Sequence, residues 1–491
     1  MVIYCGDEVS ALVVDVGGSW IRAGYAGEDT PKVVVPSWVG SSEVTEDEAS
    51  ATTKTIRNSK ADSQDPDVEM GDATASQSGS SSKDAAGGQG DVRVKNEPGT
   101  CRKYYIGDTQ ASTWRPNMDI KTPLEDGLVA DWDIYENIWN YCFYNRLRVQ
   151  PEENPLFVTE VAWNTPSLRE KMVELAFEKF NCPAFYVSKD PVLTAFASGK
   201  PTGLVLDCGG TTTSAVAVFD GYVLKKGQTY QNIAGDFISE QILAQLKQDY
   251  QKEVVPRYRV AQKSAVGPGE PAKAVLRDRP NTAPSFDHRM QMQAIHEYKE
   301  TVCQISETTF DLDALKVRPQ KPYEFPDGYN LQVGVQRYQI PEILFQPDKF
   351  IVDKTREVRL NGKAVSLSAN TGVNGTGSGN ATAKPLGIPR MIYDCISACD
   401  TDVRPHLFSN IILTGGSTLF PGFVDRVNYE LQGLAPGQRI KIQTPGNTAE
   451  RKFGTWLGGS ILSSLGSFHQ LWISKQEYQD SGASIVNKKC Q

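Results

Sequence analysis

The sequence is poor in histidine and has no pattern of paired cysteines. Its 491 residues include four histidines and nine cysteines, at positions 5, 101, 142, 182, 208, 303, 395, 399 and 490. An odd number of scattered cysteines argues against a disulfide framework. Cys395 and Cys399 form the one close pair, and neither a histidine nor a second pair stands beside them. Buried free thiols are therefore favoured over a four-ligand zinc site.

Long apolar runs and an excess of basic residues are also missing. No apolar run approaches the ~20 residues that span a bilayer, and Asp7 and Glu8 stand where a secretory signal carries positive charge. Lys plus Arg number 51 against 59 for Asp plus Glu, a formal net charge of −8. We expect a soluble protein of a reducing compartment, without membrane attachment and without direct sequence-specific nucleic-acid binding.

Aromatic residues are absent from residues 41–100, where twelve acidic residues face six basic ones. The stretch includes the run SQSGSSSKDAAGGQG and has too little apolar area to offset its ordering entropy, so it is expected to be a disordered acidic insertion. Residues 94–97 (VKNE) fit the short pattern for SUMO attachment, with Lys95 as the acceptor. Two further disordered insertions are expected at about 252–285 and about 360–387, as surface loops of a folded body.

The rest of the chain alternates strand and helix signals. Apolar runs predict strands at 11–15, 156–162, 203–207 and 410–413, and helical periodicity covers 134–147, 167–180, 237–250 and 287–305. This alternation predicts an α/β fold. The length allows two or three compact units.

An internal near-repeat is the most informative feature. The segment ALVVDVGGSWIRAGYAG (11–27) aligns with GLVLDCGGTTTSAVAVFDG (203–221). Each copy is an apolar strand ending in an aspartate (Asp15, Asp207), then a Gly-Gly turn, a hydroxyl residue and a second strand. Glycine turns can cradle phosphate oxygens with their backbone N–H groups, and two carboxylates can hold a hydrated Mg²⁺. One copy alone is more often a plain hairpin, but two matching copies favour a phosphate site across a cleft.

A third glycine motif, IILTGGSTLFPGF (411–423), again places a Gly-Gly pair after a strand and an aromatic residue nearby. Such an element can approach a nucleoside closely. The chain has no Walker loop and no protein-kinase glycine loop. The residues by themselves therefore predict a two-lobed Mg-ATP binder of a non-Walker type.

These three motifs resemble the two phosphate loops and the adenosine loop of the actin, sugar-kinase and heat-shock ATPase fold. Similarity to actin covers nearly all of the chain outside the insertions, including YIGD (105–108), EDGLVADWD (125–133), FYNRLRV (143–149), REKM (169–172), TLFPG (418–422), ERK (450–452) and WISKQEY (472–478). The resemblance implies a two-lobed α/β fold with a duplicated core. It places subdomain 1 at 1–36, 105–198 and 454–491, subdomain 2 at 37–104, subdomain 3 at 199–233 and 350–453, and subdomain 4 at 234–349.

The resemblance also implies the residues that bind ATP and Mg²⁺. The nucleotide-binding positions are Asp15, Gly17, Gly18, Ser19, Arg22, Asp207, Gly209, Gly210, Thr211, Gly235, Lys299, Glu300, Gly415, Gly416, Ser417, Phe420 and Lys452. Asp15 and Asp207 match the carboxylates that hold the metal through water. Gly18 and Arg22 stand where actin has a Ser and a Lys, so one hydroxyl is lost while the positive charge is kept.

Hydrolysis is expected to be slow or absent. Asp190 and Ser214 stand where actin has the Gln and His that orient the attacking water, and Gly210 replaces an acidic residue. An aspartate adds negative charge beside the γ-phosphate, and loss of the imidazole removes a proton relay. We expect that the protein binds ATP and that it has no catalytic residues for rapid turnover.

Three segments, GDEVSALV, GYAGEDTPK and LTAFASGKPTGLVLD, are similar to the fourth class of actin-related proteins. That class is nuclear and pairs with actin inside chromatin-remodelling and histone-acetyltransferase complexes. The resemblance implies actin as a partner and a groove for an amphipathic scaffold helix, formed by Phe196, Gly199, Leu462 and Leu465. The acidic insertion could attract histone tails, although an inert spacer is favoured. The alternatives are an active ATPase of the same fold and a filament-forming actin, and the insertions oppose the latter.

Overall fold

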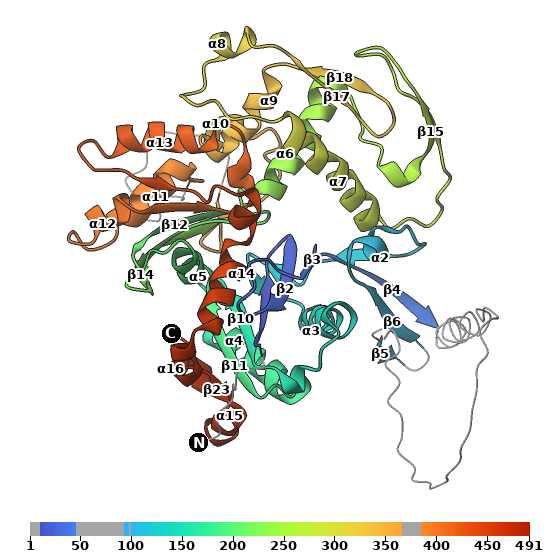
Figure 1. Cartoon of the computed structure of the whole chain (residues 1–491). Coiled ribbons are helices and arrows are strands. Elements are labelled where there is room, and N and C mark those ends of the chain that lie inside the picture. Colours follow the sequence, from blue (N-terminus) through green and yellow to red (C-terminus); the bar gives the residue numbers. More distant parts are fainter. Residues whose placement is uncertain (1–9, 46–92, 98–99, 366–383) are drawn as a thin grey trace, which may run out of the picture.

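Two large sheets carry most of the strands (Figure 1). The computed structural model describes residues 10–45, 93–97, 100–365 and 384–491. The first sheet has the strand order β23-β11-β10-β1-β2-β3 and the second β20-β19-β14-β13-β12-β21-β22. The first sheet contains β1 Leu12–Val16, β2 Trp20–Tyr25, β3 Val33–Pro36, β10 Leu156–Glu160, β11 Ala184–Lys189 and β23 Ile473–Ser474. The second contains β12 Gly203–Cys208, β13 Thr213–Phe219, β14 Tyr222–Gln231, β19 Val358–Leu360, β20 Lys363–Val365, β21 Ile411–Thr414 and β22 Ile442–Gln443.

The near-repeat of the sequence is a repeated arrangement of strands. β1 forms an antiparallel hairpin with β2 and pairs in parallel with β10. β12 likewise forms a hairpin with β13 and pairs in parallel with β21. Both leading strands are almost entirely buried, which explains their continuous apolar runs. The two aspartates at the strand ends therefore occupy equivalent places in the two sheets, and the predicted α/β fold with a duplicated core is confirmed.

Helices cover both sheets and join them. α5 (Asp190–Ala197) and α14 (Thr448–Ser464) pack against each other and contact strands of both sheets (Figure 1). The four predicted helices are α3 Trp132–Asn140, α4 Pro166–Glu174, α6 Gly235–Tyr250 and α7 Pro284–Val302. The first two continue as π-helical turns, η1 Tyr141–Leu147 and η3 Leu175–Lys179. Asp131 caps α3 by accepting a hydrogen bond from the Ile134 backbone N–H at 3.0 Å.

Further helices and 3₁₀ turns complete the two halves. The α-helices are α2 Asp108–Ser112, α8 Leu312–Lys316, α9 Gln336–Gln339, α10 Pro347–Phe350, α11 Ile388–Ser397, α12 Arg404–Phe408, α13 Phe423–Leu434, α15 Lys475–Ser481 and α16 Val486–Lys489. The 3₁₀ turns are η2 Pro151–Glu153, η4 Arg257–Arg259, η5 Pro341–Leu344, η6 Gly416–Leu419, η7 Gly466–Gln470 and η8 Ala483–Ile485. Each large sheet has its own hydrophobic core, one around Val13, Phe157 and Trp139 and the other around Leu206, Ile295 and Phe423.

Both ends of the expected insertion at 41–100 lie on strands. A small sheet, β5-β6-β4-β7, contains β4 Val39–Thr45, β5 Arg93–Glu97, β6 Thr100–Tyr105 and β7 Asp119–Lys121. Residues 94–97, expected in a disordered loop, lie on β5, where Lys95 pairs in register with Cys101. Backbone pairing with β6 gives order to a segment whose polar side chains carry no apolar signal. Residues 46–92 lie outside the described residues.

The expected disordered insertion at 252–285 is wrong. This segment contains the turn η4 and the antiparallel hairpin of β15 (Val260–Ser264) and β16 (Lys273–Leu276). Backbone hydrogen bonds between β15 and β16 order this segment, and such bonds leave no apolar pattern in the sequence. In the third insertion, residues 363–365 form β20, and residues 366–383 lie outside the described residues. The remaining hairpins are β8 Leu124–Glu125 with β9 Leu128–Val129, and β17 Lys321–Glu324 with β18 Asn330–Val333.

The cysteines of the described residues are free thiols. Cys142, Cys182, Cys208, Cys303, Cys395, Cys399 and Cys490 are all buried. Burial raises the pKa of Cys142 and of Cys208 to about 12, so both stay protonated at neutral pH. The expectation of buried thiols is thus confirmed for these seven. In the part of the chain that the structure covers, no helix is both long and apolar enough to cross a membrane.

Candidate functional site

The two Gly-Gly turns open into one cavity between the two sheets. Each turn closes in the same way: the Gly17 N–H donates to the Trp20 carbonyl and the Gly209 N–H to the Thr212 carbonyl, both at 3.0 Å. The cavity has a volume of about 550 Å³, enough for a nucleotide-sized ligand. Strand ends, glycine turns and helix starts from both halves therefore meet at one place.

Nearly all of the predicted nucleotide-binding residues line this cavity. Those on its wall are Gly17, Gly18, Ser19, Arg22, Asp207, Gly209, Gly210, Thr211, Gly235, Lys299, Glu300, Gly415, Gly416, Ser417, Phe420 and Lys452, together with Asp190 and Ser214. Asp15 does not reach the wall, because its carboxylate lies beneath it and accepts hydrogen bonds from Arg22 at 2.6 Å and Thr159 at 2.8 Å. The motifs and the family resemblance thus located one site whose wall residues run from Gly17 to Lys452 along the chain.

Three aspartates lie within electrostatic reach of one another at the cavity. Asp15, Asp190 and Asp207 influence one another electrostatically, and the guanidinium of Arg22 is bonded to Asp15. Burial and the charges of Asp15 and Asp207 hold the pKa of Asp190 well above its usual range. Its Oδ1 atom is buried without a hydrogen-bond partner among the described residues. Such a buried, unpartnered carboxylate oxygen fits a cation or a water in the cavity.

No direct metal cluster accompanies these aspartates. Among the described residues, no three His, Cys, Asp or Glu side chains come close enough to ligate one ion. The prediction that Asp15 and Asp207 hold Mg²⁺ through water stays a prediction. Oxygen ligands of this type suit Mg²⁺, which usually keeps several of its waters.

Removing the charge of Asp207 is expected to stabilise the nucleotide-free protein at neutral pH. Burial raises the pKa of Asp207 to about 6, against the opposing effect of Arg22 and with a contribution from Asp15. In the unfolded chain this pKa is about 3.9. The folded state therefore binds more protons between these two values, and stability falls as the pH rises through them. Asp207→Asn should raise the free energy of unfolding by about 1–3 kcal/mol at pH 7.5, and the gain should shrink towards zero near pH 4.

Urea unfolding in EDTA at the two pH values measures this difference. Asp220→Asn, on an exposed turn, is the matched control and should change stability little at either pH. An Asp207→Asn protein that is less stable than the wild type at pH 7.5 would contradict the assignment.

Helix α7 brings two basic side chains to the cavity wall, where they meet the start of α6. Lys299 of α7 is buried and donates to the Gly235 carbonyl at 2.6 Å and to Ser239 Oγ at 2.8 Å. Burial lowers the pKa of Lys299. Next to it, His296 lies 3.3 Å from Asp236. Burial would raise the pKa of Asp236, but His296 and the nearby positive charges hold it below its usual range.

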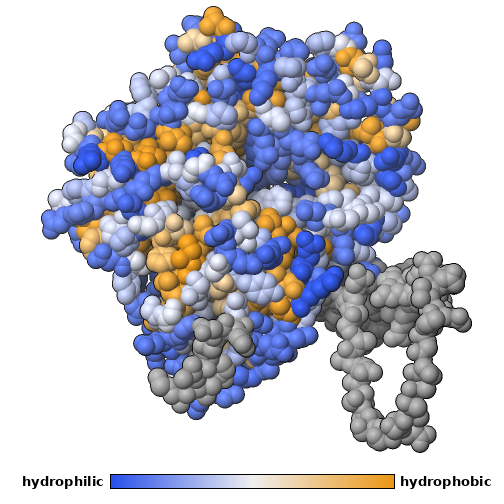
Figure 2. All heavy atoms as spheres, in the orientation of Figure 1, coloured by the Kyte–Doolittle hydropathy of each residue, from blue (hydrophilic) through white to orange (hydrophobic). Residues whose placement is uncertain are grey.

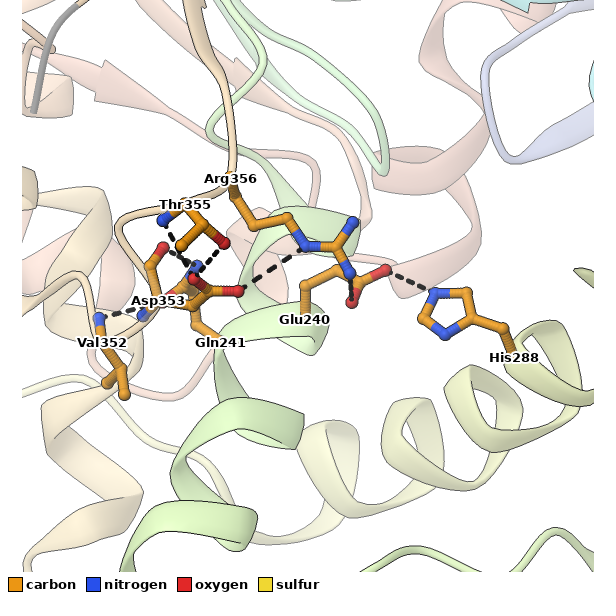
Figure 3. A network of polar contacts seen from close by, with 7 residues as sticks. All are labelled: Glu240, Gln241, His288, Val352, Asp353, Thr355 and Arg356. Atoms are coloured by element: carbon orange, nitrogen blue, oxygen red, sulfur yellow. Dashed lines mark hydrogen bonds and ion pairs between the residues drawn. The ribbon is translucent and has the colours of Figure 1, made fainter. Parts of the chain in front are cut away.

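A polar network links these helices to residues 352–356 (Figure 3). Glu240 of α6 contacts His288 of α7 and Arg356, each at 2.7 Å. The side chain of Gln241 accepts from two successive backbone N–H groups, at 2.9 Å from Val352 and 2.8 Å from Asp353. The network thereby joins α6, α7 and the segment that leads to β19.

The third glycine motif closes the cavity from the second sheet. Ser417 donates to the Gly209 carbonyl at 2.8 Å, which ties the third loop to the second one. Gly415 has φ +93°, and a Cβ there would lie 2.4 Å from Asp207 Oδ1. Only glycine suits this position, because a side chain would be strained and would displace the aspartate.

Sequence reasoning missed a contact between the two halves beside the cavity. Trp163, in the loop after β10, stacks on Tyr230 of β14 with ring centroids 3.9 Å apart and planes at 9°. Nearby, Arg359 forms ion pairs with Glu125 at 2.7 Å and Asp126 at 3.1 Å. These residues lie far apart along the chain, and no local motif marks them. His296 and Asp236 were missed as well, although Asp236 follows the predicted Gly235.

The predicted partner groove is an exposed apolar surface at α5 and α14. Phe196 is 38% exposed and Leu465 39%, and Ile461 and Leu471 are exposed beside them in the sequence. Leu462 instead packs partly against the first core, so it contributes less surface than predicted. A Cβ on Gly199 would meet no atom within 4 Å, so this position is open. Figure 2 shows apolar residues gathered at the surface in the region of α5 and α14.

Comparison with known proteins gives one consistent result. A family model described as Actin matches residues 6–491. A protein called Actin-related protein 4 from Oryza sativa subsp. japonica is 40% identical over 494 residues, covering 99% of this chain and all of the relative. Proteins of the same name from Mycosarcoma maydis and Schizosaccharomyces pombe are 37% and 36% identical, each with 99% of both chains covered.

Proposed function

The chain belongs to the actin family, and on this premise we propose that it is a non-polymerising, ATP-binding structural and regulatory subunit. It works in nuclear chromatin-remodelling and histone-acetyltransferase complexes, where it pairs with actin on a scaffold helix. The observation that carries the nucleotide part is the single cavity where both phosphate-loop motifs and the third glycine motif meet. The nuclear complexes and the pairing with actin rest on the class resemblance.

The cavity residues fit a magnesium nucleotide. The glycine turns present backbone N–H groups, and Arg22 and Lys299 place positive charge on the cavity wall. Asp207 and the unpartnered oxygen of Asp190, both on the cavity wall, offer the oxygen groups that a hydrated Mg²⁺ takes. A bound Mg²⁺ would offset the charge of the carboxylates, and the phosphates of ATP would offset that of Arg22 and Lys299. Binding would therefore stabilise the closed arrangement of the two halves by mass action.

Slow or absent hydrolysis is part of the proposal. Asp190 and Ser214 both line the cavity, in the places that the resemblance assigns to the water-orienting residues. Neither offers the amide or imidazole that orients a water and relays its proton, and positioning of that water supplies much of the rate in phosphoryl transfer. The protein therefore uses ATP for stability. The alternative is an active ATPase of the same fold.

The native protein is expected to carry stoichiometric ATP that stays intact for hours. The nucleotide is released by acid from the purified protein and identified, and added labelled ATP is then followed over time. ATP recovered intact supports the scaffold role. Recovery mainly as ADP with release of phosphate would favour the ATPase, and a protein that neither carries nor binds nucleotide would refute ATP binding.

The groove at α5 and α14 is proposed to receive an apolar helix face of a scaffold subunit. Exposed apolar side chains at Phe196, Ile461, Leu465 and Leu471 offer anchors for such a helix. Ile461→Ala with Leu465→Ala should reduce copurification of the scaffold subunit at least about tenfold, since buried apolar anchors contribute about 1–3 kcal/mol each. Leu312→Ala removes an equally exposed leucine (40%) from α8 and is the matched control. Unchanged recovery of the scaffold would count against the groove.

The insertions are the reason for proposing that this protein does not form filaments. Residues 46–92 enter between β4 and β5, and residues 366–383 follow β20, so both lie in parts that the resemblance places at filament contacts. A charged insertion opposes the repeated docking that an open polymer requires. Sedimentation in salt and Mg²⁺ separates the two cases, because a filament-forming actin pellets and a monomer does not. The acidic insertion itself is proposed to act as a spacer, with binding of histone tails as the alternative.

A further inference from the structure

The two phosphate loops touch each other across the cavity at their glycines. A Cβ built on Gly18 would lie 1.9 Å from Thr211 Oγ1, and one built on Gly210 would lie 1.8 Å from Ser19 Oγ. Each loop therefore places its hydroxyl side chain in the space that the glycine of the other loop leaves open. The arrangement is reciprocal, as expected from two equivalent hairpins facing each other.

Space, and not backbone conformation, requires glycine at these two positions. Neither Gly18 nor Gly210 has a φ in the left-handed range, so the backbone would accept other residues there. A separation below 2 Å is far inside van der Waals contact. The Cβ built on Gly18 would also lie 2.9 Å from both Cβ and Cγ2 of Thr211. Any side chain at either glycine would have to push the two loops apart.

Backbone contacts hold the two hydroxyls in these places. The Asp236 N–H donates to the Gly210 carbonyl at 2.7 Å, which fixes the second loop on α6. The Ser37 N–H donates to the Ser19 carbonyl at 3.0 Å, which fixes the first loop. Ser19 Oγ also lies 3.4 Å from Asp236 Oδ2, a contact between the two halves. Ser19 and Thr211 both line the cavity.

We propose that Ser19 and Thr211 form a reciprocal lock with Gly210 and Gly18 that holds the two halves closed over the nucleotide. In this lock Thr211 supplies, from the opposite loop, the hydroxyl that Gly18 lacks. The inference rests on the proposed nucleotide binding, and it identifies the residues that set how slowly nucleotide leaves. Because the loops interdigitate only when the halves are closed, the lock couples closure to retention of the triphosphate.

An exchange of residues between the loops tests the lock. Gly18→Ser should speed the release of a fluorescent ATP analogue at least about fivefold, because the added side chain overpacks the contact between the loops. Thr211→Gly alone should speed release by about threefold or less. The double variant Gly18→Ser with Thr211→Gly moves the hydroxyl to the other loop and should return the release rate to within about threefold of the wild type. Gly433→Ser, on open helix surface, is the control for a glycine-to-serine change.

Thermal unfolding in EDTA supplies a readout that does not depend on nucleotide. Gly18→Ser should lower the Tm and the added Thr211→Gly should restore it, because the contact exists between the protein loops themselves. A double variant that is as defective as Gly18→Ser or worse, in both measurements, would overturn the lock. If the wild type binds no nucleotide but the Tm values still show this compensation, the lock stands and the proposed ATP binding fails.

Discussion

Replacing Arg426 with methionine is expected to lower the free energy of unfolding by about 3–5 kcal/mol. Arg426 lies on α13 with its side chain fully buried, and it forms a two-pronged ion pair with the equally buried Glu342. It also donates to the carbonyls of Thr308 at 2.7 Å and Ser306 at 3.2 Å, and its guanidinium lies 4.8 Å from the centroid of the Phe345 ring. Methionine fills much of the volume but leaves Glu342 as an uncompensated buried charge.

A double variant separates the cost of the unpaired charge from the cost of lost packing. Arg426→Met with Glu342→Leu removes both charges, and it should recover much of the loss, because a buried ion pair can often be replaced by apolar groups at little cost. Arg390→Met is the matched control: Arg390 is half exposed on α11 and pairs with Asp394 four residues on, a contact worth about 0.3–0.5 kcal/mol. Denaturant unfolding measures all three. A loss below about 1 kcal/mol for Arg426→Met would show that this buried pair does not support the second core.

Restoring the water-orienting residues is expected to raise ATP turnover at least about a hundredfold, since a positioned proton-transfer group contributes about 10²–10⁴. The variant is Asp190→Gln with Ser214→His. Glutamine begins α5 with an uncharged amide in place of the carboxylate, whose pKa burial and the neighbouring aspartates raise. Histidine at 214 adds an imidazole on β13, whose residue 214 lies opposite Asp207 in the sheet.

Single-turnover release of phosphate measures this gain, with both single variants compared to the pair. At a pH high enough to ionise Asp190 despite its raised pKa, Asp190→Gln alone should also tighten ATP binding, because it removes a carboxylate charge from the cavity. Ser464→His, on the exposed end of α14, is the control for an added imidazole and should leave turnover unchanged. A double variant that binds ATP normally and hydrolyses it no faster would show that another feature, such as the missing acidic side chain at Gly210, limits the reaction.

The strand and turn motifs of the site could be predicted because they are local. An apolar run that ends in an aspartate and two glycines determines a buried strand and a tight turn by short-range sterics. The repeat in the sequence predicted the two equivalent hairpins of the fold. The glycines of the three motifs line one cavity. The segment 252–285 was misjudged because its hairpin is held by backbone pairing, which leaves no apolar signal.

The sequence by itself determined the α/β class, the three glycine motifs, the free thiols and the family of this protein. Only the tertiary structure decided which side chains meet: Thr211 against Gly18, Trp163 on Tyr230, and Asp190 beside Asp15 and Asp207. The physical reason is that strand and turn preferences act over a few residues, whereas steric fit and the pKa of a carboxylate depend on burial and on neighbours brought together by the packing of the two sheets.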